Sequence, residues 1–253
     1  MRVPDFVYSL YERSLRKQLV GKQLPKHIGI ILDGNRRWAK ELGVSASTGH
    51  RKGADHVSEV LSWCDEAKIE VVTLWMLSTD NLSRADRELS ELLNIIARLI
   101  ATLAQTKQWK LHIVGDLSLL PAEVAERIAK SCAQTDDIRG MTVNVAIGYG
   151  GRQEITAAVR SYLCERAKVG ATLEEVARSV SIADITEHIY TRGQPDPDLI
   201  IRTSGEQRMS GFMLWQTVHT ELYFCETYWP DFRRTDFLRA LRDYSQRERR
   251  LGK

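Results

Sequence analysis

The chain has 253 residues, of which 43% are hydrophobic and 27% charged. This is enough apolar sequence for one sizeable core, and so for a single domain. The formal net charge of +3 is small, and without a clustered basic stripe it argues against a nucleic-acid-binding protein. The four cysteines form no CxxC pair, so we predict neither a zinc site nor a disulfide framework. No apolar run approaches the length of a membrane span and no signal-peptide core is evident, so we expect a cytoplasmic protein.

Residues 5–20 have the pattern of a basic amphipathic helix within an N-terminal extension, residues 1–24, that precedes the main domain, residues 25–253. One face is apolar and is flanked by cations: Val7, Leu10, Tyr11 and Leu15, with Arg13, Arg16 and Lys17. The favoured interpretation is a helix that docks on its own domain. The alternative is contact with a membrane surface or a partner.

Buried strands are predicted where short apolar runs are bounded by turn signals, at residues 26–32, 70–77, 110–114, 141–147, 198–201 and 221–224. Helices are predicted between them, and Ser83 to Asp86 resembles a capping box. This box opens the longest amphipathic stretch, with an apolar face over 89–103. Further helices are expected over 121–133, from about 152, twice within 172–189, and over 235–250. The basic run at the end of the last helix is interpreted as a solvated helix end.

Strands that alternate with helices predict an α/β fold with a mostly parallel sheet. Ligands of such sheets bind beyond the carboxyl ends of the strands. That rule directs attention to residues 33–38, 78–84, 148–152 and 202–210. No P-loop, GxGxxG or GxSxG motif occurs in the sequence, which argues against a nucleotide-binding enzyme or a serine hydrolase of the common types.

The first strand end carries Asp33, Gly34, Asn35, Arg36, Arg37 and Trp38. Glycine lets backbone N–H groups approach an anion, and arginines clamp phosphate oxygens. A carboxylate suits such a place when Mg²⁺ lies between it and a phosphate. Locally, the interpretation that Asp33 only caps the next helix is equally strong.

The second strand end carries Ser78, Thr79, Asp80, Asn81 and Arg84, which also suit an ordinary turn. Residues 202–210 place two arginines and two serines around a glycine, and there we favour anion binding. Two anion sites that face an apolar helix suit two phosphorylated, hydrophobic substrates.

The chain resembles the cis-prenyltransferases, the undecaprenyl diphosphate synthase family, from about Pro25 to Gly252. The matching segments are HIGIILDGNRRWAK (27–40), GHRKGA (49–54), LSTDNLSR (77–84), GYGGR (148–152), PDLIIRTSGEQRMSGFMLWQ (197–216), ELYF (221–224) and WPDF (229–232). The resemblance implies a catalytic domain with a central, mostly parallel sheet, surrounding helices, a hydrophobic tunnel and a homodimer. The face over 89–103 is a candidate for the tunnel wall or for plain core, and different residues of it can serve each purpose.

The resemblance also implies the site. Asp33 would hold Mg²⁺ and the allylic diphosphate, Asn81 would take part in proton abstraction, and Glu221 would be a second metal carboxylate. Isopentenyl diphosphate would contact Arg202, Arg208 and Ser210. The remaining implied substrate-binding residues are Gly34, Asn35, Arg36, Arg37, Trp38, His50, Ser78, Thr79, Asp80, Leu82, Arg84 and Met209.

Departures from the long-chain pattern concern the product. Trp75 and Met76 are bulky where long-chain enzymes have a small residue, and Leu82 replaces a usual Trp. Ala46 and Asp80 replace a usual Arg and Glu. The pattern resembles actinobacterial short-chain Z-farnesyl diphosphate synthases, which predicts a short Z-prenyl diphosphate made from geranyl diphosphate. The alternatives are a C50–C55 synthase, a non-catalytic partner subunit and a cyclising relative that joins two dimethylallyl units.

Overall fold

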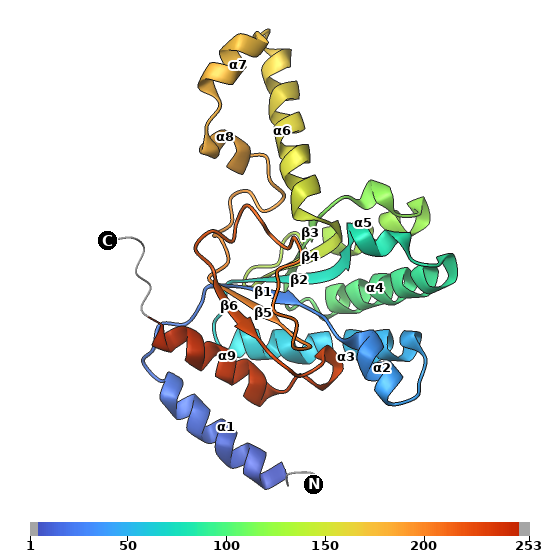
Figure 1. Ribbon diagram of the computed structural model, residues 1–253, viewed down its shortest axis with the longest axis vertical. Coiled ribbons are helices and arrows are strands. Elements are labelled where there is room, and N and C mark those ends of the chain that lie inside the picture. Colours follow the sequence, from blue (N-terminus) through green and yellow to red (C-terminus); the bar gives the residue numbers. More distant parts are fainter. Residues whose placement is uncertain (1–4, 248–253) are drawn as a thin grey trace.

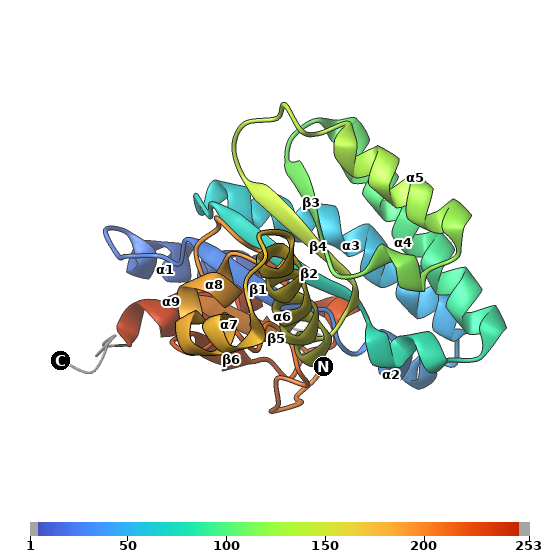
Figure 2. The same ribbon diagram turned by 90° about the horizontal axis from the view of Figure 1, so that it is seen from above.

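A computed structural model of the chain, which describes residues 5–247, has one six-stranded parallel sheet at its centre (Figures 1 and 2). The strands lie in the order β3-β4-β2-β1-β5-β6. Their bounds are β1 His27–Ile31, β2 Val71–Ser78, β3 Lys110–Val114, β4 Thr142–Tyr149, β5 Leu199–Arg202 and β6 Glu221–Phe224. The predicted α/β class and parallel sheet are therefore confirmed.

The central strands are buried on both faces because helices or loops cover each side. In β1, Ile28 and Ile30 enter the larger core, whereas Ile31 enters a smaller core on the other face. Gly29 lies where a Cβ would come within 2.3 Å of Ile200 and 3.0 Å of Phe212. A residue without a side chain is needed there for the covering loop to pack against the sheet.

The larger core is covered by helices α3 (Ala46–Glu66), α4 (Asp86–Thr106), α5 (Ala122–Ala133) and α9 (Arg234–Gln246). The short helix α2 (Asn35–Glu41) packs on α3 at one end of this layer. Beyond the sheet, α6 (Gly151–Lys168) projects from the body with α7 (Leu173–Ser179) and α8 (Ile182–Thr186) beside it (Figure 1). The short helices η1 (Thr79–Ser83), η2 (Leu117–Leu119) and η3 (Trp229–Asp231) connect the larger elements.

The N-terminal helix α1 (Asp5–Leu19) docks on the chain's own α9, as the favoured interpretation predicted. Leu15 is fully buried, and the Arg239 side chain donates to the Tyr11 hydroxyl at 3.1 Å. Arg13 and Lys17 face solvent on the outer side. Within residues 5–247, no helix is long and apolar enough to cross a membrane.

Three local predictions were wrong. Ser83 caps no helix: it belongs to η1, where its hydroxyl donates to the Asp80 carbonyl, and α4 begins after Ala85 without a side-chain cap. The strand predicted over 141–147 ends too early, because β4 continues through Tyr149, and α6 begins at Gly151. Helix α9 ends at Gln246, and Arg247 is already extended. The rest of the basic run lies outside the described residues.

Candidate active site

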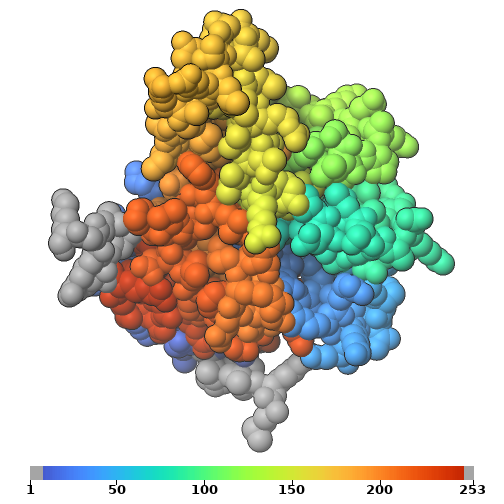
Figure 3. Space-filling model, turned by 45° about the horizontal axis from the view of Figure 1, so that its top comes forward, coloured from blue at the N-terminus to red at the C-terminus, as the bar shows by residue number. Residues whose placement is uncertain are grey.

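A cavity of about 770 Å³ opens at the carboxyl ends of β1, β2 and β5, a size typical of small-molecule sites. On the molecular surface, the segments that contain α2, the start of α4 and residues 203–213 meet on one face, which is recessed at their junction (Figure 3). The cavity is lined by thirteen of the residues predicted from the sequence: Asp33, Gly34, Asn35, Arg36, Arg37, His50, Trp75, Met76, Ser78, Asn81, Arg84, Arg202 and Ser210.

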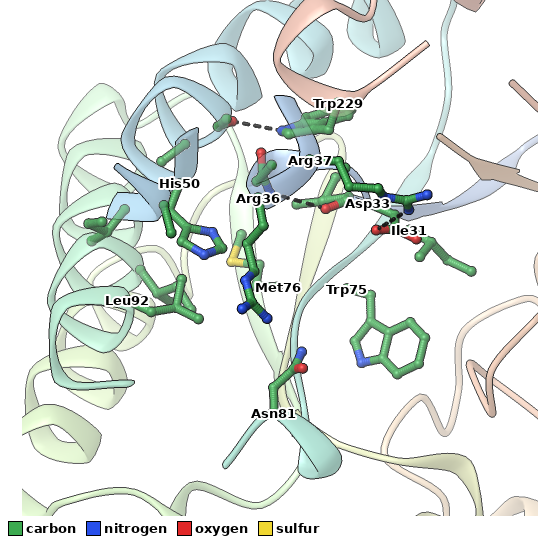
Figure 4. A pocket seen from close by; sticks show the side chains of 18 of the residues that line it. Ile31, Asp33, Arg36, Arg37, His50, Trp75, Met76, Asn81, Leu92 and Trp229 are labelled. Atoms are coloured by element: carbon green, nitrogen blue, oxygen red, sulfur yellow. Dashed lines mark hydrogen bonds and ion pairs between the residues drawn. The ribbon is translucent and has the colours of Figure 1, made fainter. Parts of the chain in front are cut away.

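Asp33 is the carboxylate at the mouth of this cavity (Figure 4). Its two oxygens accept from Arg202 at 2.8 Å and from Arg37 at 3.2 Å. Its backbone N–H donates to the Thr203 hydroxyl at 3.0 Å. Burial alone would raise the pKa of Asp33, but the hydrogen bond and charge of Arg202, with the charge of Arg37, hold that pKa below its usual value. The carboxylate is therefore ionised at neutral pH, and Asp33 caps no helix, since Gly34 occupies the cap position of α2.

The glycines of the first motifs allow close backbone packing behind Asp33. Gly34 has a φ of 107°, a left-handed conformation, and a Cβ there would come within 2.7 Å of Tyr228. In α3, a Cβ on Gly49 would lie 2.2 Å from the Asn35 carbonyl oxygen, and one on Gly53 would lie 2.1 Å from the Asn35 amide oxygen. The GHRKGA segment thus serves to seat α2 against α3.

Arg202 is the most deeply buried cation at the site. Besides Asp33, its guanidinium donates to the Ser210 hydroxyl at 2.8 Å and to the Arg208 carbonyl. Because both of these partners belong to the loop after β5, that loop folds around the Arg202 side chain. Within it, Ser210 has a left-handed backbone conformation with a φ of 51°. The Arg202 Nε–H is buried and has no hydrogen-bond partner among the described residues.

Two arginines from different strand ends share one carboxylate that the sequence analysis missed. Glu88, in the first turn of α4, lies 3.3 Å from Arg84 and 3.5 Å from Arg36. Arg84 also donates to the Asn81 amide oxygen at 2.9 Å. The i, i+4 spacing of Arg84 and Glu88 was the available sequence signal. Glu206 was missed in the same way, and it forms ion pairs with both Arg37 and Arg208.

His50 lines the cavity from α3, close to this cation cluster (Figure 4). Burial, followed by the positive charge of Arg84, lowers the pKa of His50 to about 4. Its Nε2 atom is buried and has no hydrogen-bond partner among the described residues. The imidazole is therefore neutral at physiological pH and offers a polar nitrogen to the cavity without a charge.

The inner part of the cavity is apolar. Leu92, Ile95, Ile96 and Leu99 of α4 line it, together with Val57 of α3 and Met76 of β2. Leu93, Ile100 and Leu103 of the same predicted apolar face lie in the core and do not line the cavity, whereas Leu92 and Ile96 belong to the core and also border the cavity. The face over 89–103 is therefore partly core and partly cavity wall.

Seven predicted site residues do not line the cavity: Trp38, Thr79, Asp80, Leu82, Arg208, Met209 and Glu221. Trp38 turns away and donates to Asp231 at 2.8 Å. Glu221 does not lie near Asp33 of the same chain. It is the first residue of β6, paired in register with Leu199 at the amino end of the sheet, whereas Asp33 follows the carboxyl end of β1. Its side chain forms an ion pair with Arg247. In one chain, therefore, Glu221 is not a second carboxylate beside Asp33.

The residues present fit a magnesium ion that relies on substrate oxygens. Among residues 5–247, no three His, Cys, Asp or Glu side chains gather into a metal site. Mg²⁺ commonly takes one or two carboxylates and fills its other positions with phosphate oxygens and water. Asp33 is a carboxylate ligand of that kind, because its side chain is partly exposed in the cavity beside several arginines.

The fold is an α/β domain with a parallel sheet. At the carboxyl edge of this sheet lie an ionised carboxylate, an arginine cluster and an apolar inner cavity. Together they indicate an enzyme whose substrates carry an anionic group and a hydrophobic group. The family model described as putative undecaprenyl diphosphate synthase matches residues 31–252. The chain therefore belongs to the undecaprenyl diphosphate synthase family and is a prenyltransferase, which confirms the resemblance and the cis-prenyl chain elongation that it implies.

Similar proteins cover the chain from end to end. An isoprenyl transferase of Corynebacterium efficiens is 52% identical over 100% of both chains. A (2Z,6E)-farnesyl diphosphate synthase of Thermobifida fusca is 53% identical over 100% of this chain and 98% of its own. A short-chain Z-isoprenyl diphosphate synthase of Mycobacterium leprae is 49% identical with the same coverage.

The fold is likewise that of a solved prenyl-transferring enzyme. Lavandulyl diphosphate synthase from Lavandula x intermedia, in complex with dimethylallyl diphosphate, superposes with a TM-score of 0.84 and 32% identity. The match covers 91% of this chain and 99% of that one. The predicted fold is therefore confirmed at the level of the whole domain.

Proposed function

We propose that the chain condenses isopentenyl diphosphate with a short allylic diphosphate, geranyl diphosphate in particular, in a magnesium-dependent reaction that yields a short Z-prenyl diphosphate such as (2Z,6E)-farnesyl diphosphate. The observation that carries the proposal is the continuous cavity that runs from Asp33 and its arginines to the apolar wall formed by α3, α4 and Met76. One end suits a diphosphate and the other a prenyl chain.

At the mouth of the cavity, Arg36 and Arg37 bind and orient the allylic diphosphate, and Asp33 holds the magnesium ion. The ion, when bound, neutralises charge that grows on the leaving diphosphate. The fixed guanidinium groups contribute to the same stabilisation without reorganisation. Arg202 and Ser210 hold isopentenyl diphosphate on the neighbouring strand end, which places the two substrates side by side.

In this proposal Asn81 acts as a hydrogen-bond donor that helps to position the substrates, and not as the base that removes the proton. Arginine has only hydrogen-bond donors, so the Asn81 atom that faces Arg84 must be the amide oxygen. The oxygen thus accepts from Arg84, whereas the amide NH₂ has no hydrogen-bond partner within residues 5–247. A neutral amide is also a weak base, so we assign the leaving proton to a diphosphate oxygen.

A short product is supported by Met76 and by the relatives. The Met76 side chain lies between the arginine cluster and the inner wall (Figure 4), where bulk shortens the space for a growing chain. Two relatives about 50% identical over essentially the whole chain carry names that specify farnesyl or short-chain Z-prenyl products.

Homodimer formation also belongs to the proposal. The projecting helices α6 and α8 expose apolar side chains, among them Val159, Leu163 and Ile182. A second copy would cover them. We expect a dimer by size-exclusion chromatography with light scattering, and a Val159→Lys, Leu163→Lys variant that elutes as a monomer. A monomeric wild type would contradict this part of the proposal.

A cytoplasmic location and a peripheral membrane contact of α1 stay predictions from the sequence.

The central experiment is an incubation of the purified protein with radiolabelled isopentenyl diphosphate, Mg²⁺ and each of the dimethylallyl, geranyl and farnesyl primers. We expect the geranyl primer to give a fifteen-carbon product that chromatography resolves by length and geometry, and chelation of the metal to abolish it. Chains near C50–C55 would contradict the short-chain assignment, and no product with any primer would contradict the enzyme function.

A further inference from the structure

Glu88 lies behind the cation cluster rather than in the cavity. Its carboxylate is next to Arg36, in the helix α2 that follows β1, and to Arg84, directly after the short helix η1 that follows β2. Both arginines line the cavity, whereas Glu88 does not. A carboxylate in this place does not bind the substrate. It joins two strand ends through the side chains that do.

The contact with Arg84 extends to Asn81. Within one guanidinium, Nη1 donates to Glu88 and Nη2 donates to the Asn81 amide oxygen. Because a guanidinium is planar and its donors have fixed directions, holding one edge of Arg84 fixes the direction of the other. Asn81 lines the cavity, and its NH₂ group has no hydrogen-bond partner among the described residues. The orientation of that group therefore depends on Glu88 through Arg84.

The charges of the cluster add a second effect. Arg36, Arg84 and Arg37 face the same cavity, and among the charged groups next to them Glu88 offsets part of their positive charge. Removal of its negative charge strengthens the field that a bound diphosphate experiences. Ground-state binding of the diphosphate and correct placement of Asn81 should thus respond to Glu88 in opposite directions.

We propose that Glu88 is a positioning residue: through Arg84 it orients the Asn81 amide for the condensation step, at the expense of some diphosphate affinity. The inference rests on the proposed prenyl elongation, in which Asn81 takes part. A residue that merely stabilised the fold would not separate turnover from binding in this way.

The test uses the full-length Glu88→Gln variant, which keeps the size and an amide oxygen but removes the charge. We expect kcat for condensation to fall about tenfold or more, while KM for the allylic diphosphate and the Kd of inorganic diphosphate, measured by calorimetry, stay the same or decrease. Glu91→Gln is the matched control, because Glu91 forms an i, i+4 pair with Arg87 one turn further along α4 and does not line the cavity. It should behave as wild type.

A double variant shows whether Glu88 acts through Asn81. Asn81→Ala combined with Glu88→Gln should turn over no more slowly than Asn81→Ala alone, since the orientation of an absent amide no longer matters. The inference is overturned if the two losses multiply, if Glu88→Gln keeps wild-type kcat, or if it weakens diphosphate binding in step with kcat. A wild-type protein that binds diphosphate but makes no product would instead refute the proposed function.

Discussion

Trp75 and Met76, consecutive residues of β2, point to opposite faces of the sheet and touch the cavity from different sides (Figure 4). Met76 packs against the larger core beneath α3 and α4, whereas Trp75 stacks on Phe212 at 5.0 Å in the smaller core. Across the sheet, Trp75 is in register with Ile31, which is in register with Arg202. Trp75 and Met76 were predicted from the sequence to limit product length together, but in the structure they lie on opposite faces of the sheet.

Met76→Ala should therefore lengthen the product by one or more isoprene units, because it removes bulk on the side of the cavity where the proposed function puts the prenyl chain. The product distribution, separated by chain length after incubation with geranyl and isopentenyl diphosphates, is the measurement. Trp75→Phe keeps an aromatic ring against Phe212 and serves as the comparison, with an unchanged product length expected. A longer product from Trp75→Phe with none from Met76→Ala would reverse this assignment.

Much of the fold could be predicted from the sequence because its signals are local. Apolar runs such as 26–32 and the periodic face over 89–103 identified the sheet and its longest covering helix. Helix ends were harder to predict. Ala85, at the cap position before α4, has no side chain that can cap the helix, and Arg247 leaves the helical conformation without a glycine or proline. Those boundaries depend on tertiary contacts that no local pattern carries.

The site could be predicted in its strand ends but not in the partners of its charged residues. Asp33, Asn81 and Arg202 were found because they follow buried strands. Glu88 lies just beyond the segment 78–84, and Glu206 lies within the segment 202–210. Neither was given a role, because each contacts its arginines only after folding. The reverse holds for Glu221. It was predicted as a site residue from a family motif, but its register at the start of β6 places it away from Asp33 of the same chain.

Asp33→Asn tests the carboxylate itself. We expect turnover to fall about 10²–10³-fold, because an amide neither holds a magnesium ion well nor balances Arg202 and Arg37. The free energy of unfolding should decrease by about 1–3 kcal/mol, since the buried Arg202 loses its charged partner. Steady-state kinetics over a range of Mg²⁺ concentrations and urea unfolding measure the two effects. Asp55→Asn, an exposed carboxylate of α3 outside this cavity, is the control, and equal losses in both variants would refute a specific role.

Replacement of Asn81 separates donation from base catalysis. Asn81→Ala should lower kcat about 10²–10³-fold, the range typical of the loss of one positioned hydrogen-bond donor. Asn81→Asp supplies a far stronger base but removes the NH₂ donors and draws Arg84 into an ion pair. It should therefore be no more active than Asn81→Ala. An Asn81→Asp variant with kcat at or above wild type would show that the side chain accepts a proton.

The response of stability to pH should depend on His27, a fully buried histidine of β1. Its Nδ1–H donates to the Pro195 carbonyl at 2.7 Å and its Nε2 accepts from the Thr73 hydroxyl at 2.8 Å, an arrangement that only the neutral ring satisfies. Burial, against the weaker opposing effects of that carbonyl and of Asp198, lowers the pKa of His27 from 6.5 to about 4.

Between these two values the unfolded chain binds a proton that the folded chain does not, so the free energy of unfolding falls as pH decreases from about 6.5 to about 4. The contribution of His27 is about 3 kcal/mol over that range. His50 titrates in the same window, so the wild-type slope contains both histidines. Urea unfolding at several pH values should show a smaller slope for His27→Gln, whose amide keeps one donor and one acceptor but does not titrate. The same slope in both proteins would mean that His27 is protonated without cost in the folded state.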